Sequence, residues 1–291
     1  MLSAQTSEPD PLASALRRKA QAGGAGATEA TPVAAGNGWS VVDIVCTSGP
    51  RDRPFEERHW SPSISLVLSG TFVYRSSRGP SLLSAGALVL GDAGKTYECA
   101  HQHGEGDRCL SFSFDPELFE ELAHDAGAAR AAFACDRVPP LPALASLTAR
   151  ARIGMGRRDL LEEIALELAG AVVRVAAEAR RTPPATPDPA RIAPLLRELE
   201  ARSAEPHTLP ELARRAGLSR YHFLRTFKDV TGVTPHQWLL RARLRDAAHR
   251  LVTTRAPVTE IALDVGFDDL SNFIRSFRAE FGVSPRRYRA G

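Results

Sequence analysis

The last third of the chain carries the same residue pattern twice, and this repeat limits the fold more than any other feature. Residues 217–235 read GLSRYHFLRTFKDVTGVTP, and residues 266–285 read GFDDLSNFIRSFRAEFGVSP. Positions that return 49 or 50 residues later in the same or a similar form are Glu211, Leu212, Ala213, Gly217, Phe223, Arg225, Phe227, Gly232 and Pro235. A chain with such an internal repeat is expected to build one supersecondary unit twice.

Each copy has the local signals of a helix, a turn and a second helix. In the first copy, Pro210 suits the first position of a helix, and Gly217 suits the left-handed residue that ends it. Ser219 is then the expected N-cap of a second helix, on which Phe223 and Phe227 share an inner face. The pattern predicts a helix-turn-helix in each copy.

The charge of the chain is concentrated in the same region. Residues 190–291 hold 18 Lys/Arg and 11 Asp/Glu, a net charge of +7, whereas the rest of the chain has a net charge of −4. A helix-turn-helix sets its second helix into the major groove of DNA. Two units, joined by a long helix expected over 235–254, would reach grooves ~34 Å apart. The alternative is a structural helical bundle with arginine on its solvated face.

Residues 190–290, about a third of the chain, resemble the DNA-binding domain of AraC/XylS-type transcription regulators. The motifs that carry the resemblance are LARRAGLSRYHFLRTFKDVTGVTPHQWL and VTEIALDVGFDDLSNFIRSFRAEFGVSPRRYRA. The resemblance implies a sequence-specific regulator of transcription that binds double-stranded DNA and is no enzyme. The outer faces of the two second helices are then expected to contact DNA through Arg220, Tyr221, His222, Arg225, Lys228, Ser271, Asn272, Arg275 and Arg278.

The chain departs from the usual family pattern at several positions of these faces. Leu224, Leu270 and Ile274 stand where members often have polar residues. These side chains would give apolar contacts, for example to a thymine methyl group, or none. Asp268 and Asp269 are less suited to phosphate than serine, and we expect them to cap the helix instead.

The composition divides the chain into four parts and predicts an α+β protein. Residues 1–36 are expected to be a disordered tail, and residues 37–181 a cupin-like β-barrel or sandwich with trailing helices. The proline-rich residues 182–189 are expected to be a linker before the helical DNA-binding domain at 190–291. An apolar helix at 159–181 would pack on the β domain or on a second subunit.

The front domain resembles the cupin-like domain that the family commonly uses to bind an effector and to dimerise. The resemblance implies a homodimer, a small-molecule effector, and RNA polymerase as a partner if the protein is an activator. An organic effector would be lined by residues such as Phe72, Tyr74, Leu90 and Tyr97. The domain could also serve for dimerisation alone.

The stretch YECAHQHGEGDRC, residues 97–109, holds a possible metal site. If residues 97–103 form a strand, Cys99, His101 and His103 point to one face, and Cys109 could return opposite them. Thiolate and imidazole form a zinc-type ligand set, so zinc is the candidate cofactor. The alternatives are a thiol-redox sensor, a disulfide between Cys99 and Cys109, and buried cysteines that act as small hydrophobes.

Two further classes of protein fit the sequence less well. A cupin-type metal-dependent enzyme fused to a helical domain would use His101, His103 and Glu105, but their spacing departs from the metal-binding cupin motif. The longest apolar runs are far shorter than the ~18–20 residues of a membrane-spanning helix, and the first residues do not resemble a signal peptide. We therefore expect a cytoplasmic protein with reduced cysteines.

Overall fold

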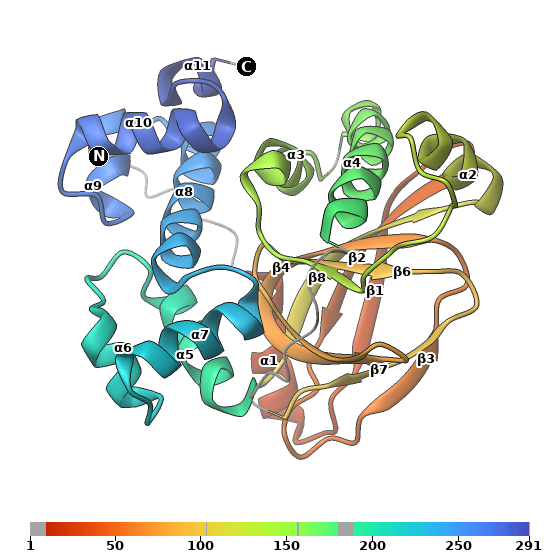
Figure 1. Cartoon of the computed structure of the whole chain (residues 1–291), viewed down its shortest axis with the longest axis horizontal. Coiled ribbons are helices and arrows are strands. Elements are labelled where there is room, and N and C mark those ends of the chain that lie inside the picture. The colour runs from red at the N-terminus through yellow and green to blue at the C-terminus, as the bar shows by residue number, and fades with distance from the viewer. Residues whose placement is uncertain (1–9, 103, 156, 180–188, 291) are drawn as a thin grey trace.

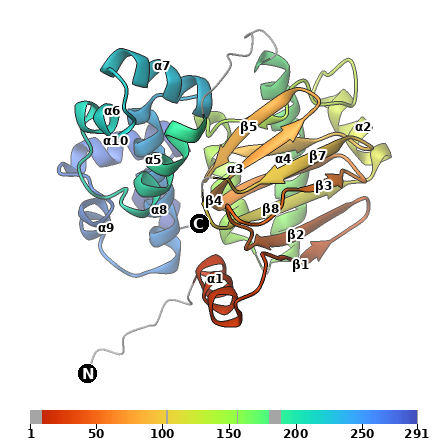
Figure 2. The ribbon, with the colours of Figure 1, turned by 90° about the horizontal axis from the view of Figure 1, so that it is seen from below.

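The computed structural model describes residues 10–102, 104–155, 157–179 and 189–290 of the chain. They form an antiparallel β domain with helices, followed by an all-helical domain, so the predicted α+β class is confirmed (Figure 1). Figure 2 shows the two domains side by side. The predicted linker, residues 182–189, lies outside the described residues except for Pro189, which begins a helix.

The front domain consists of two antiparallel layers that share one long strand. The first layer has the order β1-β2-β8-β4-β6-β9, and the second contains β3, β7 and β5 around the other end of β4. Because β4 has fourteen residues, it can pair with β8 and β6 and then bend to pair with β5 and β7. The strands are Thr28–Ala35 (β1), Trp39–Cys46 (β2), Phe55–Arg58 (β3), Ser63–Ser76 (β4), Gly79–Ser84 (β5), Leu88–Gly91 (β6), Thr96–Ala100 (β7), Asp107–Phe114 (β8) and Arg137–Val138 (β9).

Alternation along the strands divides the apolar side chains between two cores. Leu88 and Leu90 of β6 face three helices that cover the first layer, whereas Val89 faces the space between the two layers. The covering helices are Pro116–Asp125 (α2), Pro142–Ile153 (α3) and Arg158–Ala179 (α4). Side chains of α4 such as Leu161 and Leu168 are fully buried in this core. The helix predicted at 159–181 therefore packs on its own β domain.

The expectation of a disordered tail over residues 1–36 is wrong for the described part of that segment. Pro11–Ala22 form helix α1, and β1 pairs along its length with β2. Leu12 and Ala15 of α1 are buried against Val45. Composition misled the prediction because β1 is an edge strand with exposed side chains, so its stability comes from backbone pairing and leaves no apolar alternation to detect.

The back domain contains the two predicted helix-turn-helix units, with a long helix between them (Figure 1). Pro189–Ala201 (α5) packs against the first unit, and a short last helix packs against the second. Thr234 and Gln237 form a capping box that starts the long helix. The remaining helices are Leu209–Arg215 (α6), Arg220–Thr231 (α7), Pro235–Thr253 (α8), Val258–Asp264 (α9), Leu270–Phe281 (α10) and Pro285–Arg289 (α11).

The front domain contributes side chains to the cores of both helix-turn-helix units. Val73, Leu82 and Ala100 of the β domain lie in one apolar cluster with α5, α6 and α7. Ala145 of α3 lies in the cluster that α8, α9 and α10 form. The indole of Trp238, which is fully buried, donates a hydrogen bond to Ser84 across this boundary, with Nε1 and Oγ 3.3 Å apart. The two domains therefore share their apolar interior.

Candidate nucleic-acid interface

The first helix-turn-helix unit is built as its sequence predicts. Thr208 caps α6, and Gly217 takes a left-handed conformation with φ of 65° between the two helices. The hydroxyl of Ser219 accepts a hydrogen bond from the backbone N–H of His222 and so starts α7. Phe223 is fully buried on the inner side of α7, which fixes the opposite side toward solvent.

The second unit repeats this geometry with a different cap. Gly266 has φ of 91°, and the carboxylate of Asp269 accepts hydrogen bonds from the backbone N–H groups of Ser271 and Asn272. The expected capping role is thus confirmed for Asp269. Phe273 is fully buried, as is its counterpart in α7. Both second helices have the same length and the same left-handed glycine at their C-terminal end.

Small residues hold the first helix of each unit close to the second. Ala213 and Ala262 are 2% and 1% exposed, inside the cores of their units. The long helix α8 runs between the units and joins them without a break (Figure 1). The described residues thus place α7 and α10 as the two equivalent helices of a repeated unit.

The outer faces of α7 and α10 present the residues that were predicted to contact DNA. All of these side chains are exposed: Arg220, Tyr221, His222, Arg225, Lys228, Ser271, Asn272, Arg275 and Arg278. Within the described part of the chain, Arg225 makes a long ion pair with Asp229, with Nε and Oδ2 3.8 Å apart at an exposed position. Such a pair contributes little and leaves the guanidinium available to a ligand.

Three apolar side chains lie on the same outer faces. Leu224, Leu270 and Ile274 are 37%, 38% and 38% exposed, although large apolar residues are generally buried. They lie among the exposed polar and basic residues of the two helices. Exposed apolar groups within a polar face suit contact with methyl groups of a partner.

The position of α7 is fixed from the front domain by one arginine. Arg137 of β9 donates hydrogen bonds to the backbone carbonyls of Asp229, at 3.0 Å, and Val230. These carbonyls belong to the last turn of α7, where intrahelical partners are missing and the helix dipole favours a cation. Burial lowers the pKa of the Arg137 guanidinium. The front domain thus caps the first of the two outer helices.

A cluster of charged side chains also lies between the domains. Glu200 at the end of α5 faces Arg245 of α8 and Arg152 of α3. Burial raises the pKa of Glu200 to about 7, although the two arginines oppose that shift. Burial lowers the pKa of Arg245 to about 10. The charge state of this cluster is therefore linked to the contact of the two domains.

The front domain has an open cavity of about 720 Å³ beside strands β4, β7 and β8. Its lining is mixed: it includes His59, Trp60, Tyr97 and serine hydroxyls that face each other across β4 and β8. One such pair is Ser65 and Ser111, whose Oγ atoms are 2.9 Å apart. The cavity can thus offer several hydrogen-bonding groups to a small molecule.

The residues predicted to line an effector site are only partly brought together. Phe72, Tyr74 and Tyr97 belong to the cluster between the two β layers, but Leu90 belongs to the core beneath the helices. Tyr74 and Leu90 meet in a separate pocket of about 100 Å³. Of the four, only Tyr97 lines the large cavity, whose serines the sequence pattern did not reveal.

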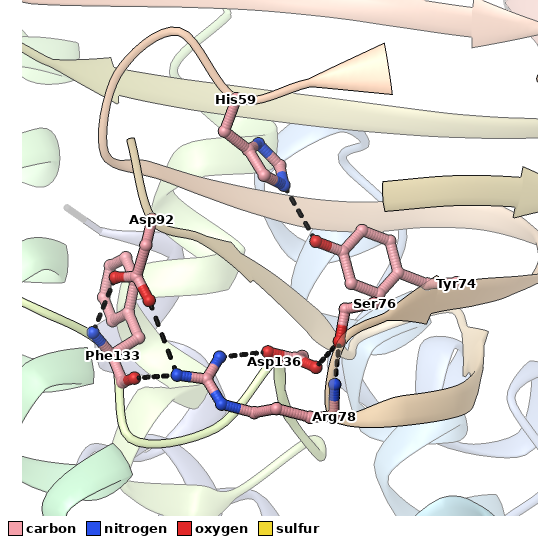
Figure 3. Close-up of polar contacts among 7 residues, drawn as sticks. All are labelled: His59, Tyr74, Ser76, Arg78, Asp92, Phe133 and Asp136. Atoms are coloured by element: carbon pink, nitrogen blue, oxygen red, sulfur yellow. Dashed lines mark hydrogen bonds and ion pairs between the residues drawn. The ribbon is translucent and has the colours of Figure 1, made fainter. Parts of the chain in front are cut away.

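His59 lines the large cavity and contacts the side chains of several neighbouring residues. Its Nε2 lies 2.8 Å from the hydroxyl of Tyr74 (Figure 3). Its Nδ1 lies 3.2 Å from the hydroxyl of Ser63, and the ring of Tyr97 stacks on it. Burial lowers the pKa of His59 to about 4, so the ring is neutral at pH 7. It therefore serves as a hydrogen-bonding group and not as a charge.

An ionic network fixes the loop next to this region. The guanidinium of Arg78 contacts Asp136, lies 3.5 Å from the carboxylate of Asp92 and donates to the carbonyl of Phe133 at 2.8 Å (Figure 3). Ser76 also contacts Asp136. The network joins the hairpin of β4 and β5 to the segment before β9. Strand β9 itself carries Arg137.

The predicted metal ligands are only partly brought together: Cys99 and Cys109 lie in the cluster between the two β layers, and Asp107 contacts both Cys109 and His101. His103 lies outside the described residues. Strand β7 ends at Ala100, and β8 pairs with β2 and β4 but not with β7, so Cys109 is not a cross-strand partner of Cys99 or His101. Cys109 instead lies opposite Ile44 and Val67. All four cysteines are free thiols.

Among the described residues no helix is long and apolar enough to cross a membrane.

Comparison with known proteins bears on the C-terminal part. Residues 212–291 match the family described as helix-turn-helix domain. The right origin-binding protein of Escherichia coli K12 is 38% identical over 95 residues, which are 33% of this chain and 33% of that protein. The HTH-type transcriptional activator RhaS of Klebsiella pneumoniae is 40% identical over 107 residues, 37% of this chain and 38% of that protein.

A solved structure gives a similar match. The DNA-binding domain of AdpA, in complex with a target DNA, is 34% identical and covers 34% of this chain and 90% of that chain, with a TM-score of 0.34. The chain spans about a third of the length of the first curated relatives that it matches. RhaS is named as a transcriptional activator, and neither it nor the origin-binding protein is named as an enzyme. Residues 212–291, with their two helix-turn-helix units, therefore form a DNA-binding domain of the AraC/XylS type.

Proposed function

We propose that the chain is a sequence-specific DNA-binding regulator of transcription that reads DNA with α7 and α10. One observation carries this proposal. Two equivalent capped helices each bury a phenylalanine pair inward and expose polar and basic side chains outward, within the basic part of the chain. If α7 and α10 served only as a structural scaffold, nothing would require both helices to expose the same pattern of polar and basic side chains.

In the proposed complex each helix enters a major groove. Arg225 and Arg275 occupy equivalent positions of the repeat and are exposed, so each can bind the O6 and N7 atoms of a guanine. Leu224 and Ile274, which precede them, can contact thymine methyl groups. The remaining exposed basic residues would bind phosphates and position the two helices.

We also propose that the cavity of the front domain binds a small polar effector. Its paired serines, the neutral ring of His59 and the exposed Trp60 supply donors, acceptors and an aromatic face. Family resemblance favours a homodimer that acts as an activator in the cytoplasm and contacts RNA polymerase. These partners belong to the proposal as well.

The test is selection of binding sites from a library of random DNA duplexes by the full chain, followed by fluorescence anisotropy on the selected sequence. The variants are Arg225→Ala and Arg275→Ala. Each is expected to weaken specific binding by about 1–3 kcal/mol, that is roughly fivefold to 150-fold, and to relax the sequence preference at one position. Arg202→Ala is the matched control, because Arg202 is exposed and pairs with Glu205 outside α7 and α10.

Two results would contradict the proposal at different levels. If the chain selects no sequence above the library background, sequence-specific recognition is wrong. If it selects a site but both alanine variants bind that site as the wild type does, the assignment of α7 and α10 as the recognition helices is wrong.

A further inference from the structure

Three buried side chains outside the proposed DNA interface converge at one end of the β domain. Cys46, His101 and Asp107 are 4%, 4% and 6% exposed. One sulfur, one ring nitrogen and one carboxylate oxygen from them all lie within 4.8 Å of one another. Within the described residues, these three side chains are the ones that lie close enough together to bind one metal ion. Neither the DNA-binding surface nor the large cavity uses these residues.

The strand pairing explains why these residues meet. Cys46 is the last residue of β2 and Asp107 the first residue of β8, and the two are direct cross-strand partners. Side chains of such partners lie on the same face of the sheet, about 4.5–5.5 Å apart at their Cβ atoms. His101 directly follows β7, the strand of the facing layer. The cluster therefore joins the ends of three strands and both layers.

The polar contacts of the cluster leave room for a further partner. The Nε2 atom of His101 is 2.6 Å from Oδ1 of Asp107, and the thiol of Cys109 donates to Oδ2 of the same carboxylate at 3.3 Å. The second ring nitrogen of His101, Nδ1, is buried and has no hydrogen-bond partner among the described residues. The ring therefore contacts Asp107 and also lies close to the thiol of Cys46, and its second nitrogen remains available to a bound ion.

We propose that Cys46, His101 and Asp107 form a binding site for a divalent transition metal ion of the zinc class. A thiolate, an imidazole and a carboxylate are ligands of zinc, and the thiolate disfavours magnesium and calcium. At bond lengths of about 2.0–2.3 Å, ligand atoms around a tetrahedral zinc ion lie about 3.4–3.6 Å apart. The three atoms reach this spacing through small side-chain movements. On binding, Cys46 releases its thiol proton to solvent, and His101, whose pKa is in spite of its burial raised to about 9 by its contact with Asp107, releases one ring proton. The fourth position stays open.

Neighbouring residues complete the site. The contact of Cys109 with the second oxygen of Asp107 orients the carboxylate, as outer partners of metal ligands commonly do. Helix α1 covers the same end of the domain, and a side chain at Gly106 would meet both Leu12 and the backbone oxygen of Cys46. A bound ion would therefore be shielded from bulk water.

The test uses the full chain, freed of metal by dialysis against a chelator, and titrates it with Zn²⁺ against a chromophoric competitor and with Co²⁺ alone. We expect one ion per chain, with a thiolate-to-cobalt charge-transfer band. Cys46→Ser is expected to abolish that band and to weaken Zn²⁺ binding at least tenfold. Cys135→Ser is the matched control, since Cys135 is half-buried in the segment before β9 and should leave binding unchanged.

A second measurement needs no variant and so does not depend on the folding of one. X-ray absorption at the zinc edge of the wild-type protein should show one sulfur neighbour at about 2.3 Å, with the other neighbours nitrogen or oxygen. Three results would overturn the proposal: no stoichiometric binding by the wild type, a zinc shell without sulfur, or a folded Cys46→Ser variant that binds as the wild type does.

Discussion

Replacement of Arg137 by alanine should loosen the contact between the two domains. The guanidinium donates to two carbonyls in the last turn of α7, and hydrogen bonds to a charged group are each worth about 1.5–3 kcal/mol. Burial of the guanidinium, which lowers its pKa, offsets part of this gain. We therefore expect Arg137→Ala to reduce the free energy of unfolding by about 2–4 kcal/mol, with a contribution from the lost interaction with the helix dipole.

Calorimetry measures the loss of stability of the whole protein, and hydrogen exchange measures the local loosening at the end of α7. For a domain pair of this size the loss corresponds to a fall in Tm of roughly 4–16 °C, at about 2–4 °C for each kcal/mol. Amide exchange should accelerate most near Gly232, whose N–H bonds to the carbonyl of Lys228 at the end of α7. Arg137→Lys, which keeps the charge but loses the two-pronged geometry, should fall between the alanine variant and the wild type.

Arg130→Ala is the control for this experiment, because Arg130 is an exposed residue of the same segment before β9. It should unfold as the wild type does. If Arg137→Ala also unfolds at the wild-type temperature, with unchanged exchange at the end of α7, then Arg137 does not hold the domains together and the reasoning fails.

Three further predictions concern the turn, the buried carboxyl and the ionic part of DNA binding. Gly266→Ala should destabilise the chain more than Gly282→Ala in urea unfolding, because both glycines have positive φ but only a Cβ at Gly266 would collide with the backbone of Ala204; equal losses would contradict this. Because the pKa of Glu200 is raised to about 7 from 4.5, the stability that its protonated form contributes is complete below about pH 4.5 and is lost as the pH rises through 7. Relative to the wild type, Glu200→Gln should therefore gain stability across that interval, and a constant difference between the two proteins would refute the shift. Affinity for DNA should fall roughly tenfold for every two phosphate contacts between 50 and 200 mM salt, and a flat anisotropy titration would exclude counterion release.

The repeated units were predictable from the sequence because their signals are local. Gly217 and Ser219 mark the turn and the cap by their own backbone and side-chain chemistry, and both act as expected. The inner face of α7 follows from the four-residue spacing of Phe223 and Phe227, which are fully buried. None of these features depends on a distant part of the chain.

The parts that sequence reasoning missed depend on pairing between distant segments. The cluster at Cys46 exists because Cys46 and Asp107 are partners in the register of β2 and β8, and no spacing within either stretch reveals that register. Strand β1 likewise gains its order from β2 and not from an apolar pattern. The role of Arg137 required the docking of two domains, which neither domain's sequence encodes alone.

The apolar interior shared by the two domains has a consequence for how the chain could be divided. A fragment that begins at residue 190 would lose Val73, Leu82 and Ala100 from the core of its first unit, and Ala145 from that of its second. Each helix-turn-helix unit is therefore stabilised by a different part of the front domain, which itself contains no helix-turn-helix unit. The angle between the two reading helices, and with it the curvature of DNA that they can follow, becomes a property of the complete chain, so a chimaera that exchanged the front domain would inherit a new angle along with a new cavity.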